Sequence, residues 1–476
     1  MKSYNNYIAG EWVNGDVSVA NINPSDVDDV IGEATHATLK QVVEAASAAK
    51  LALPSWSSTT SQTRSDILSK ISNELFARKE ELGDLMSREE GKTRAEASGE
   101  VVRAANIFRF FANETVRIRG EKIASVRADI DVEVSREPVG VVGVITPWNF
   151  PIAIPAWKIA PALAFGNTVV FKPSEMTPAI SCALAEIIVG AGVPAGVFNM
   201  VLGTGPAIGE AMIDSVDAIT FTGSAKVGRH IVQRATSRMI RVQAEMGGKN
   251  PLVILDDADF DTSVRCALDG SFFQTGQRCT ASSRLIVTEG IHDRFVSALA
   301  ERLNRLVVGH ALEASTQVGP VVGERQLNQD LYFVNVGIDE GARPLLKGER
   351  LKKATSGFYL SPTLFIDSTN QMRINREEIF GPVAAVIRVK NYDEALAVAN
   401  DTPFGLSSGI CTTSQKYARN FQMHSQSGLT MLNLPTAGLD YHVPFGGRKA
   451  SSYGAREQGT YAIEFYTIVK TSYLTV

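Results

Sequence analysis

The sequence has few cysteines, no long apolar run and no block of charge of one sign. Four cysteines among 476 residues are too few for a disulfide framework, and they suit a reducing compartment such as the cytoplasm. No apolar run approaches the roughly 20 residues that cross a bilayer, and no apolar signal region precedes Trp12. A net charge of −4 with interspersed signs gives no basic surface for nucleic acid or lipid. We therefore expect a cytoplasmic protein without nucleic-acid or membrane partners.

Several catalytic signatures are also missing. The six histidines are scattered, with none at metal-ligand spacing, so no metal site is expected. Neither a P-loop nor a G-x-S-x-G nucleophile elbow is present. The length, with 44% apolar and 21% charged residues, fits a globular protein of two or three domains.

Hydrophobic patterning divides the chain into a helical first third and two regions of alternating elements. Apolar residues recur at helical spacing over 39–53 and 63–98. From about residue 137, buried-strand patterns alternate with helical ones, which predicts an α/β fold with a doubly wound parallel sheet. The predicted strands are 139–145, 168–171, 198–202 and 218–221, with helices at 178–189, 206–213 and 226–236. A second α/β region has predicted strands at 251–255, 384–387 and 409–411.

A cysteine in a polar loop is the first candidate for chemistry. Cys279 directly follows Arg278, and a neighbouring cation favours the thiolate, which is the nucleophilic form. Cys182, Cys266 and Cys411 lie in apolar stretches and are typical of small core residues.

Two other side chains could assist a nucleophilic cysteine. Glu245 precedes two glycines and could act as a general base if burial raises its pKa. Asn149 stands among aromatic residues and prolines, where a fixed amide could donate to an oxyanion. Taken singly, Glu245 is more typical of a surface charge at a helix end, and Asn149 also fits a turn.

Two strand-to-helix junctions could bind a nucleotide. Thr222, Gly223 and Ser224 precede a predicted helix, whose N-terminus favours an anion. Lys172 and Glu175 follow another strand and could bind ribose hydroxyls, while the carboxylate would repel a 2′-phosphate. An ordinary turn and a surface charge pair are the alternatives at these two places.

Together and in this order, these stretches resemble the aldehyde dehydrogenase superfamily over nearly the whole chain. The matching motifs lie at 147–151, 172–175, 221–224, 245–249, 276–279, 378–382 and 444–447. The resemblance implies an α/β aldehyde dehydrogenase fold with a Rossmann-like cofactor domain, an α/β catalytic domain and a small β oligomerisation element. The expected boundaries are 1–117 with 137–247 for the NAD(P)-binding domain, 248–448 for the catalytic domain, and 118–136 with 449–476 for the oligomerisation element.

The resemblance also implies a role for each matching residue. Cys279 would attack the aldehyde carbon, Asn149 and the Cys279 backbone N–H would hold the oxyanion, and Glu245 would activate water to hydrolyse the thioester. Members that transfer the acyl group to coenzyme A generally lack this base, so Glu245 favours release of the free acid. The implied cofactor-binding residues are Ile145, Thr146, Pro147, Trp148, Lys172, Ser174, Glu175, Gly205, Phe221, Thr222, Gly223, Ser224, Val227, Glu245, Met246, Gly247, Glu378 and Phe380. NAD is the preferred cofactor, and NADP is possible.

The segment 436–459 looks like the α-ketoglutaric semialdehyde (2,5-dioxopentanoate) dehydrogenases, although Ala450 and Ala455 replace a glycine and a proline of that pattern. Such an enzyme would form 2-oxoglutarate. A substrate carboxylate wants a basic side chain, and Arg278 could either bind it or support the thiolate. The expected substrate-contacting residues are Phe150, Trp157, Phe273, Arg278 and Phe445.

Other functions remain open. The substrate could be succinic semialdehyde, although the succinic semialdehyde dehydrogenases typically carry arginine where this chain has Trp157, or the enzyme could accept many uncharged aldehydes. A non-catalytic nucleotide-binding protein is a remote alternative, because Cys279, Glu245 and Asn149 are all present.

We expect a homodimer or a homotetramer. The tail 465–476 alternates Tyr, Thr and Val like an exposed edge strand, and exposed edges attract partner strands. In either assembly the segment 117–135 and the tail would form an intersubunit sheet.

Overall fold

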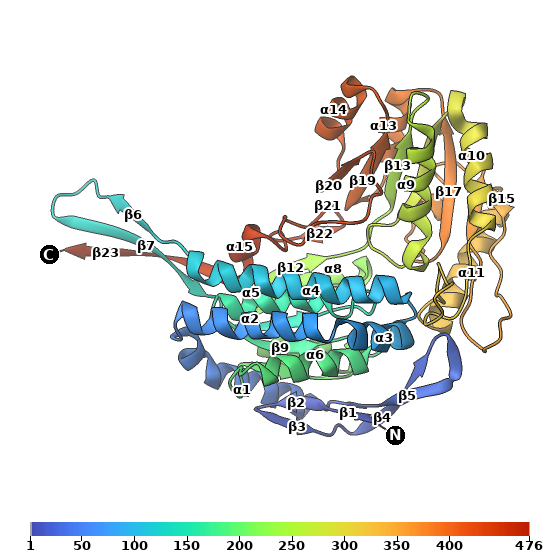
Figure 1. Cartoon of the computed structure of the whole chain (residues 1–476). Helices are drawn as coiled ribbons and strands as arrows, with labels where there is room; N and C mark the ends of the chain where they lie inside the picture. Colours follow the sequence, from blue (N-terminus) through green and yellow to red (C-terminus); the bar gives the residue numbers. More distant parts are fainter. Residues whose placement is uncertain (1, 476) are drawn as a thin grey trace.

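The computed structural model describes residues 2–475 and contains two α/β lobes, with a long β arm extending from the first (Figure 1). An eight-stranded sheet lies in the first lobe and a seven-stranded sheet in the second. Two smaller sheets contain β1 (Ser3–Tyr4), β5 (Asp26–His36) and β4 (Val17–Asn23), and β18 (Phe404–Gly405) with β21 (Arg448–Lys449).

The first sheet has a parallel centre with antiparallel strands at both edges. Its order is β22 (Ser452–Tyr453), β12 (Arg241–Glu245), β11 (Ala218–Thr222), β8 (Val141–Ile145), β9 (Thr168–Lys172), β10 (Phe198–Met200), β2 (Asn6–Ile8) and β3 (Glu11–Val13). The four strands predicted here are present with small shifts at their ends, whereas β12 was not predicted.

Helices cover both faces of this sheet because its central strands are apolar on both sides. Along β8, Val142 and Val144 pack into one core, while Val141 and Ile145 pack into the other, as the alternation of side chains in a strand requires. The first core includes residues of α2 (Ser61–Ala77), α3 (Lys79–Glu90), α4 (Arg94–Glu114), α5 (Ala153–Ala164) and α6 (Pro178–Gly190). The second includes residues of α1 (Leu39–Ser57), α7 (Gly205–Ser215) and α8 (Ala225–Ser237).

The helical pattern over 63–98 corresponds to three helices rather than one. A break at Arg78 separates α2 from α3, and Gly91 in a left-handed conformation, with φ of 95°, ends α3. Thr93 then starts α4 with a capping box, in which Thr93 and Glu96 bond to each other's backbone N–H groups. Side-chain periodicity continues across these breaks, so the pattern alone did not show them.

The second lobe repeats the layered arrangement. Its sheet is parallel except for β15. The order is β15 (Arg343–Leu346), β16 (Thr363–Ile366), β17 (Val383–Val389), β14 (Ser282–Thr288), β13 (Asn250–Ile254), β19 (Ser407–Cys411) and β20 (Leu429–Leu432). The helices are α9 (Phe260–Phe272), α10 (Glu289–Asn304), α11 (Glu324–Asp339), α12 (Arg373–Arg376), α13 (Tyr392–Asn400) and α14 (Gln415–His424), and the 3-10 turn η2 (Phe273–Gly276) follows α9. Two other 3-10 turns lie elsewhere: η1 (Thr115–Arg117) follows α4 of the first lobe, and η3 (Thr460–Ala462) lies near the C-terminus.

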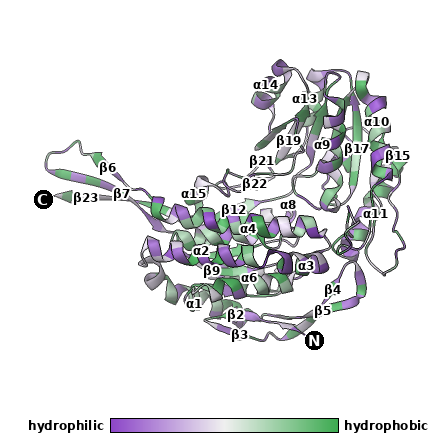
Figure 2. Cartoon of the chain, viewed as in Figure 1, coloured by the Kyte–Doolittle hydropathy of each residue, from purple (hydrophilic) through white to green (hydrophobic). Residues whose placement is uncertain are grey.

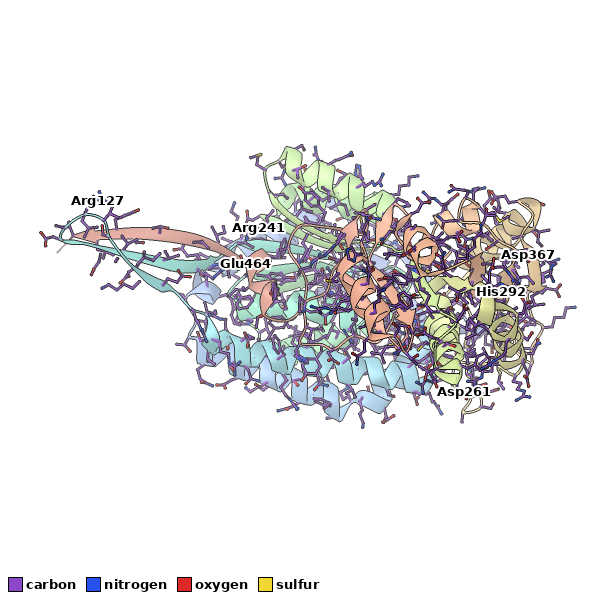
Figure 3. All side chains as sticks on the ribbon, turned by 90° about the horizontal axis from the view of Figure 1, so that it is seen from above. Arg127, Arg241, Asp261, His292, Asp367 and Glu464 are labelled. Atoms are coloured by element: carbon purple, nitrogen blue, oxygen red, sulfur yellow. The ribbon has the colours of Figure 1, made fainter. Side chains whose placement is uncertain are left out.

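The arm is a three-stranded antiparallel sheet in the order β23 (Thr467–Thr475), β7 (Ile130–Pro138) and β6 (Glu121–Ala124). Viewed from above, it projects away from the lobes with Arg127 near its tip, while Arg241 and Glu464 lie at its base (Figure 3). The predicted edge strand is present as β23, which pairs only with β7, while residues 465–466 belong to α15 (Ile463–Tyr466). Val476 lies outside the described residues.

Hydrophobic residues occur on the arm as well as in the lobes (Figure 2). Ile468, Val469, Tyr473 and Leu474 of β23 are all exposed. An exposed strand edge with apolar side chains is a typical pairing surface. Among residues 2–475, no helix has the length and apolarity needed to cross a membrane.

Candidate active site

The candidate active site lies at the carboxyl ends of the first sheet's central strands. From β8 the chain continues into β9 on one side, while β11 lies on the other side of β8. This reversal is the switch point at which doubly wound sheets bind ligands. β8 ends just before Asn149, and β12 ends at Glu245, so both predicted partners of the cysteine lie at this edge.

The loop that carries Cys279 has a strained backbone and is held in place by hydrogen bonds from Asn250. Gln274 and Thr275 adopt left-handed conformations with φ of 52° and 56°, which are unfavourable for side chains of this kind. Asn250 Nδ2 donates to the carbonyls of Cys279 at 2.8 Å and of Ala281 at 2.9 Å. These bonds fix the backbone on both sides of the cysteine, so its thiol has a defined position.

Asn149 approaches this loop from the first lobe. Its buried side-chain amide donates from Nδ2 to the Gln277 carbonyl at 3.0 Å, two residues before Cys279. Because an amide nitrogen has two N–H groups, one remains to donate to an oxygen near the thiol. The predicted nucleophile and oxyanion donor are therefore brought together.

A buried charge cluster supports Asn149 and was not predicted. Lys92 Nζ donates to the Asn149 carbonyl at 2.8 Å and to Glu100 Oε2 at 2.5 Å. Glu100 Oε1 also accepts from the backbone N–H groups of Ile152 and Ala153. Sequence reasoning missed Lys92 and Glu100 because charged residues usually lie at the surface.

Burial controls the protonation of Cys279. Burial, together with the charges of Glu378 and Glu245, raises the pKa of the thiol to about 12. Arg278 acts in the expected direction and lowers this pKa, but burial outweighs its effect. The Arg278 guanidinium donates to the carbonyls of Asp269 and Gly270.

Glu245 is buried with one carboxylate oxygen free of any partner among the described residues. Its other oxygen accepts from the Ser452 hydroxyl. Burial raises the pKa of Glu245 well above its ordinary value, and the nearby carboxylate of Glu457 adds to this effect. Glu457 forms a fully buried ion pair with Lys158. A proton acceptor of raised pKa thus lies at the site, as a general base near neutral pH requires.

Four of the five predicted substrate residues lie close to these groups. Trp157 and Phe445 are buried and stack with their ring centres 5.3 Å apart. Lys92 lies over the Phe150 ring at 4.6 Å. Phe273 instead packs against a cluster in the second lobe that contains Val308, Val318 and Tyr359. Arg278 directly precedes Cys279, and its guanidinium is turned toward backbone carbonyls, as described above.

The predicted ribose-binding pair is present after β9. Lys172 is buried, and its Nζ donates to the carbonyls of Pro173 at 2.8 Å and Gly203 at 2.9 Å. Glu175 is exposed, with its carboxylate 3.9 Å from Lys172 Nζ. Ser174 is buried, and its hydroxyl accepts from the Met176 backbone. The exposed carboxylate is therefore available to a ligand above the strand ends.

The turn after β11 has the geometry predicted for an anion site. Ser224 is the N-cap of α8, and its hydroxyl accepts from the Val227 backbone at 3.5 Å. The hydroxyls of Thr146 and Thr222 are buried without partners among the described residues. The remaining predicted cofactor residues lie around the same edge of the sheet: Ile145 and Phe221 in β8 and β11, Pro147 after β8, Gly205 at the start of α7, and Met246 after β12.

Glu378 reaches this edge from the second lobe. It accepts from the Gly248 backbone at 3.1 Å, and burial raises its pKa to about 7. A Cβ at position 247 would lie 1.9 Å from the Glu378 carboxylate, so any other residue there would displace this side chain. Phe380 has a left-handed φ of 68° and meets Trp148 edge to face at 5.5 Å. The motifs 147–151, 245–249 and 378–382 are thus in contact across the lobes.

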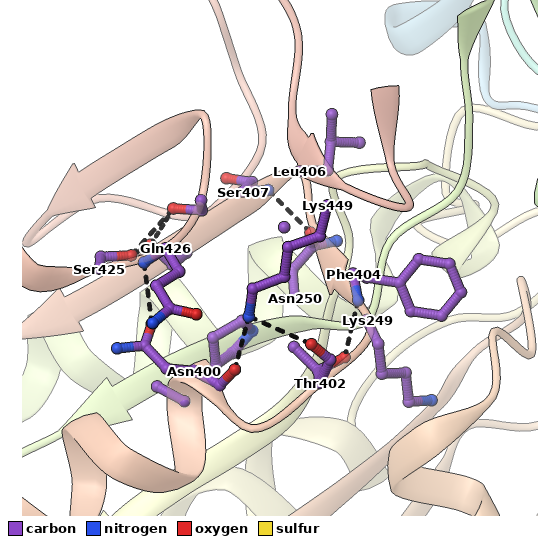
Figure 4. A pocket seen from close by; sticks show the side chains of 15 residues that line it. Lys249, Asn250, Asn400, Thr402, Phe404, Leu406, Ser407, Ser425, Gln426 and Lys449 are labelled. Atoms are coloured by element: carbon purple, nitrogen blue, oxygen red, sulfur yellow. Dashed lines mark hydrogen bonds between the residues drawn. The ribbon is translucent and has the colours of Figure 1, made fainter. Parts of the chain in front are cut away.

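A separate polar pocket lies behind the cysteine loop, in the second lobe (Figure 4). Ser407 donates from its backbone to Asn250 Oδ1 at 3.0 Å, and Lys449 Nζ donates to the carbonyls of Asn400 and Thr402. The pocket contains neither the thiol nor Glu245. Its bonds support Asn250, which holds the loop of Cys279.

Among residues 2–475, no group of acidic, histidine and cysteine side chains is arranged to hold a metal ion.

Comparisons with known proteins agree with this geometry. The model of the aldehyde dehydrogenase family matches residues 12–472. The chain is 42% identical to an alpha-ketoglutaric semialdehyde dehydrogenase of Bacillus subtilis, over 100% of this chain and 98% of that protein. It is 40% identical to an alpha-ketoglutarate semialdehyde dehydrogenase of Haloferax volcanii, over 98% of each.

Solved structures also match the fold over nearly the whole chain. Betaine aldehyde dehydrogenase of Staphylococcus aureus in complex with NAD+ matches with a TM-score of 0.96 at 34% identity, covering 99% of this chain and 94% of that one. An NADP-dependent enzyme of E. coli matches with a TM-score of 0.95 at 34% identity, covering 100% and 98%. With its whole length matched and its cysteine, amide and carboxylate converging at one edge of the sheet, the chain belongs to the aldehyde dehydrogenase family.

Proposed function

We propose that this aldehyde dehydrogenase oxidises α-ketoglutaric semialdehyde to 2-oxoglutarate with NAD(P)+. The support for the substrate is the identity of 42%, 40% and 38% to relatives named for it, from a bacterium and two archaea. The observation that carries the mechanism is the convergence of Asn149 and Glu245 on the loop of Cys279.

In the first step, the Cys279 thiol gives its proton to solvent water and its sulfur attacks the aldehyde carbon. The carbonyl oxygen becomes an alkoxide, which accepts from Asn149 Nδ2 and from the Cys279 backbone N–H. Fixed donors stabilise the developing charge without reorganising. Asn149 is fixed by the hydrogen bond that its carbonyl accepts from Lys92 and by the one that its amide donates to the Gln277 carbonyl. The product is a thiohemiacetal on Cys279.

The residues at the sheet edge fit a nicotinamide dinucleotide. The unpartnered hydroxyls of Thr146 and Thr222 offer hydrogen bonds at the switch point. Ser224 and the N-terminus of α8 would hold the pyrophosphate, and Lys172 with Glu175 would hold the adenosine ribose. A bound NAD(P)+ would supply the acceptor for the hydride of the aldehyde carbon. Cys279 would then carry the acyl group as a thioester.

In the last step, Glu245 takes a proton from a water molecule that attacks the thioester carbon. The carbon–sulfur bond breaks, Cys279 is regenerated as the thiolate, and the carboxylic acid leaves. The raised pKa of Glu245 suits it to accept this proton, because a base is most effective when its pKa is near the working pH.

The test is nicotinamide reduction by the purified enzyme with α-ketoglutaric semialdehyde, succinic semialdehyde and pentanal in parallel. The proposal predicts the highest kcat/KM for the keto-semialdehyde, by at least about tenfold over pentanal. Equal or faster oxidation of pentanal would overturn the substrate assignment and leave the aldehyde dehydrogenase chemistry in place.

Succinic semialdehyde is the second candidate substrate. The chain is 38% identical to a succinate-semialdehyde dehydrogenase of Arabidopsis thaliana, and this aldehyde also ends in a carboxylate. Trp157 stands where the resemblance expects an arginine for that substrate. The same assay decides between the two semialdehydes.

We predict that Glu175→Ser shifts cofactor use toward NADP. The exposed carboxylate would repel a 2′-phosphate, and its loss would leave the charge of Lys172 uncompensated. The ratio of kcat/KM for NADP to that for NAD should rise about tenfold or more, equivalent to ~1.4 kcal/mol. Glu186→Gln, a change of an exposed carboxylate on α6, is the matched control. An unchanged ratio would remove Glu175 from cofactor selection.

We further propose that the arm joins subunits in a homodimer or homotetramer. The support is the exposed apolar edge of β23.

The proposed domains are 1–117 with 137–247 for the cofactor, 248–448 for catalysis, and 118–136 with 449–476 for assembly, although β22 of the last segment also pairs with β12. The chain is proposed to work in the cytoplasm.

A further inference from the structure

Arg103 of α4 lies beside the aromatic pair of the site. Its guanidinium carbon lies 5.9 Å from the centre of the Trp157 ring, and Trp157 stacks on Phe445. The next residue, Gly446, is so close to Glu245 that a Cβ there would lie 2.7 Å from the carboxylate. A short series of contacts therefore connects Arg103 to the proposed base. The same arginine is close enough to interact electrostatically with Cys279.

The charge of Arg103 is not used by a carboxylate. Its two recorded hydrogen bonds go to neutral oxygens, the Leu439 carbonyl and Gln458 Oε1, the latter at 3.1 Å. Within residues 2–475, no ion pair involves Arg103. The nearby Glu100 is paired with Lys92. A guanidinium has five N–H donors, so several remain for a ligand.

Gln458 supplies a second unused donor at the same place. The residue is fully buried, and its Nε2 has no partner among the described residues. Since Arg103 only donates, Gln458 must turn Oε1 toward it and Nε2 elsewhere. Gln458 also has a left-handed φ of 59°. A buried, unsatisfied amide on a strained backbone is costly, and an anionic acceptor would satisfy it.

The other basic side chains near the thiol each donate to protein oxygens, although the buried Arg278 Nε has no partner among the described residues. Arg278 donates to the carbonyls of Asp269 and Gly270. Lys92 is fully buried and paired with Glu100. Arg456 donates to the Gly447 carbonyl. Arg103 therefore differs from them in combining proximity to the aromatic pair with an adjacent free amide donor.

We infer that Arg103, assisted by Gln458, binds the carboxylate at the far end of the substrate and thereby selects aldehydes that carry an acid group. The inference rests on the proposed function and names the residue that gives it specificity. Burial strengthens such a contact, because the competing water is removed, and Arg103 is largely desolvated, which lowers its pKa. Trp157 and Phe445 would line the carbon chain between the carboxylate and the aldehyde.

The test compares Arg103→Met with the wild type on α-ketoglutaric semialdehyde and on pentanal, which has the same chain length and no charge. The ratio of kcat/KM for the charged to the uncharged aldehyde should fall about 100-fold, mostly through KM, because a contact kept from ground state to transition state acts on binding. Arg103→Lys should restore part of the ratio, since it keeps the charge but loses the planar fork.

Arg109→Met is the matched control on the same helix. Arg109 is exposed, and its guanidinium lies over the Phe76 ring at 4.6 Å, so its loss should not change the ratio. An equal fall for both aldehydes in Arg103→Met would mean that Arg103 only holds the Leu439 segment, and the inference would be overturned. A retained ratio would also overturn it. A wild type without preference for the charged aldehyde would overturn the proposed function itself, which distinguishes the two failures.

Discussion

Cys279→Ala should abolish aldehyde oxidation while NAD+ binding stays close to that of the wild type. The methyl group cannot form the carbon–sulfur bond, so no thiohemiacetal and no thioester can arise. We expect kcat to fall by at least about 10⁴-fold. The measurements are NADH formation with the preferred aldehyde and the Kd for NAD+ from calorimetry. Turnover retained near the wild-type rate would exclude Cys279 as the nucleophile.

Cys182→Ala provides the control, because Cys182 is buried in the first core and its thiol lies away from the site. It should leave kcat within about threefold, because it removes only packing.

Alkylation gives an independent check. Cys279 is the only cysteine of the four that is not fully buried, so iodoacetamide should modify it first. The rate should rise with pH, because burial raises the pKa of this thiol and only the thiolate reacts.

The strands of the first sheet show what the sequence predicts well. β8, β9 and β11 are continuous apolar runs between helices, and such runs are typical of strands buried on both faces. β12 was missed because Arg241, Gln243 and Glu245 alternate with apolar residues, although Gln243 and Glu245 are buried in the structure. Alternation of polar and apolar residues normally indicates a strand with one face exposed to solvent. In β12 the polar side chains Gln243 and Glu245 are buried instead, in the site and among the residues that support it.

The catalytic residues were found by their neighbours in the sequence and by resemblance, whereas their supports depend on distant contacts. Lys158 and Glu457 are 299 residues apart, and neither looks unusual locally. The same limitation applies to Arg278: its charge lowers the pKa of Cys279 as expected, but adjacency in sequence did not reveal that its guanidinium turns to backbone carbonyls. Burial, which dominates the pKa of Cys279, cannot be judged from sequence neighbours.

Glu245→Gln should separate the two halves of the reaction. The amide has nearly the shape of the carboxylate but cannot take a proton from water, so thioester hydrolysis should slow by about 10²- to 10³-fold. Hydride transfer comes before this step and should persist. Rapid mixing with NAD+ and aldehyde should therefore give a burst of NADH close to the concentration of active sites, followed by slow steady turnover.

The pKa shift of Glu245 predicts how steady-state turnover changes with pH. Burial and the Glu457 carboxylate raise the pKa of Glu245, so the basic form becomes more populated as the pH rises, and steady-state turnover of the wild type should increase through this range. In Glu245→Gln this part of the profile should disappear, because glutamine does not titrate.

Glu464→Gln, at the base of the arm in an ion pair with Arg136, is the control for Glu245→Gln and should keep the wild-type profile. The burst decides the role of Glu245 more sharply than the rate alone. Slow turnover without a burst would mean that Glu245 acts before hydride transfer, on the thiol whose pKa of about 12 also calls for a proton acceptor. An unchanged steady-state rate would remove Glu245 from the mechanism. A burst with slow turnover assigns Glu245 to hydrolysis of the thioester, and with it the release of a free acid as the product.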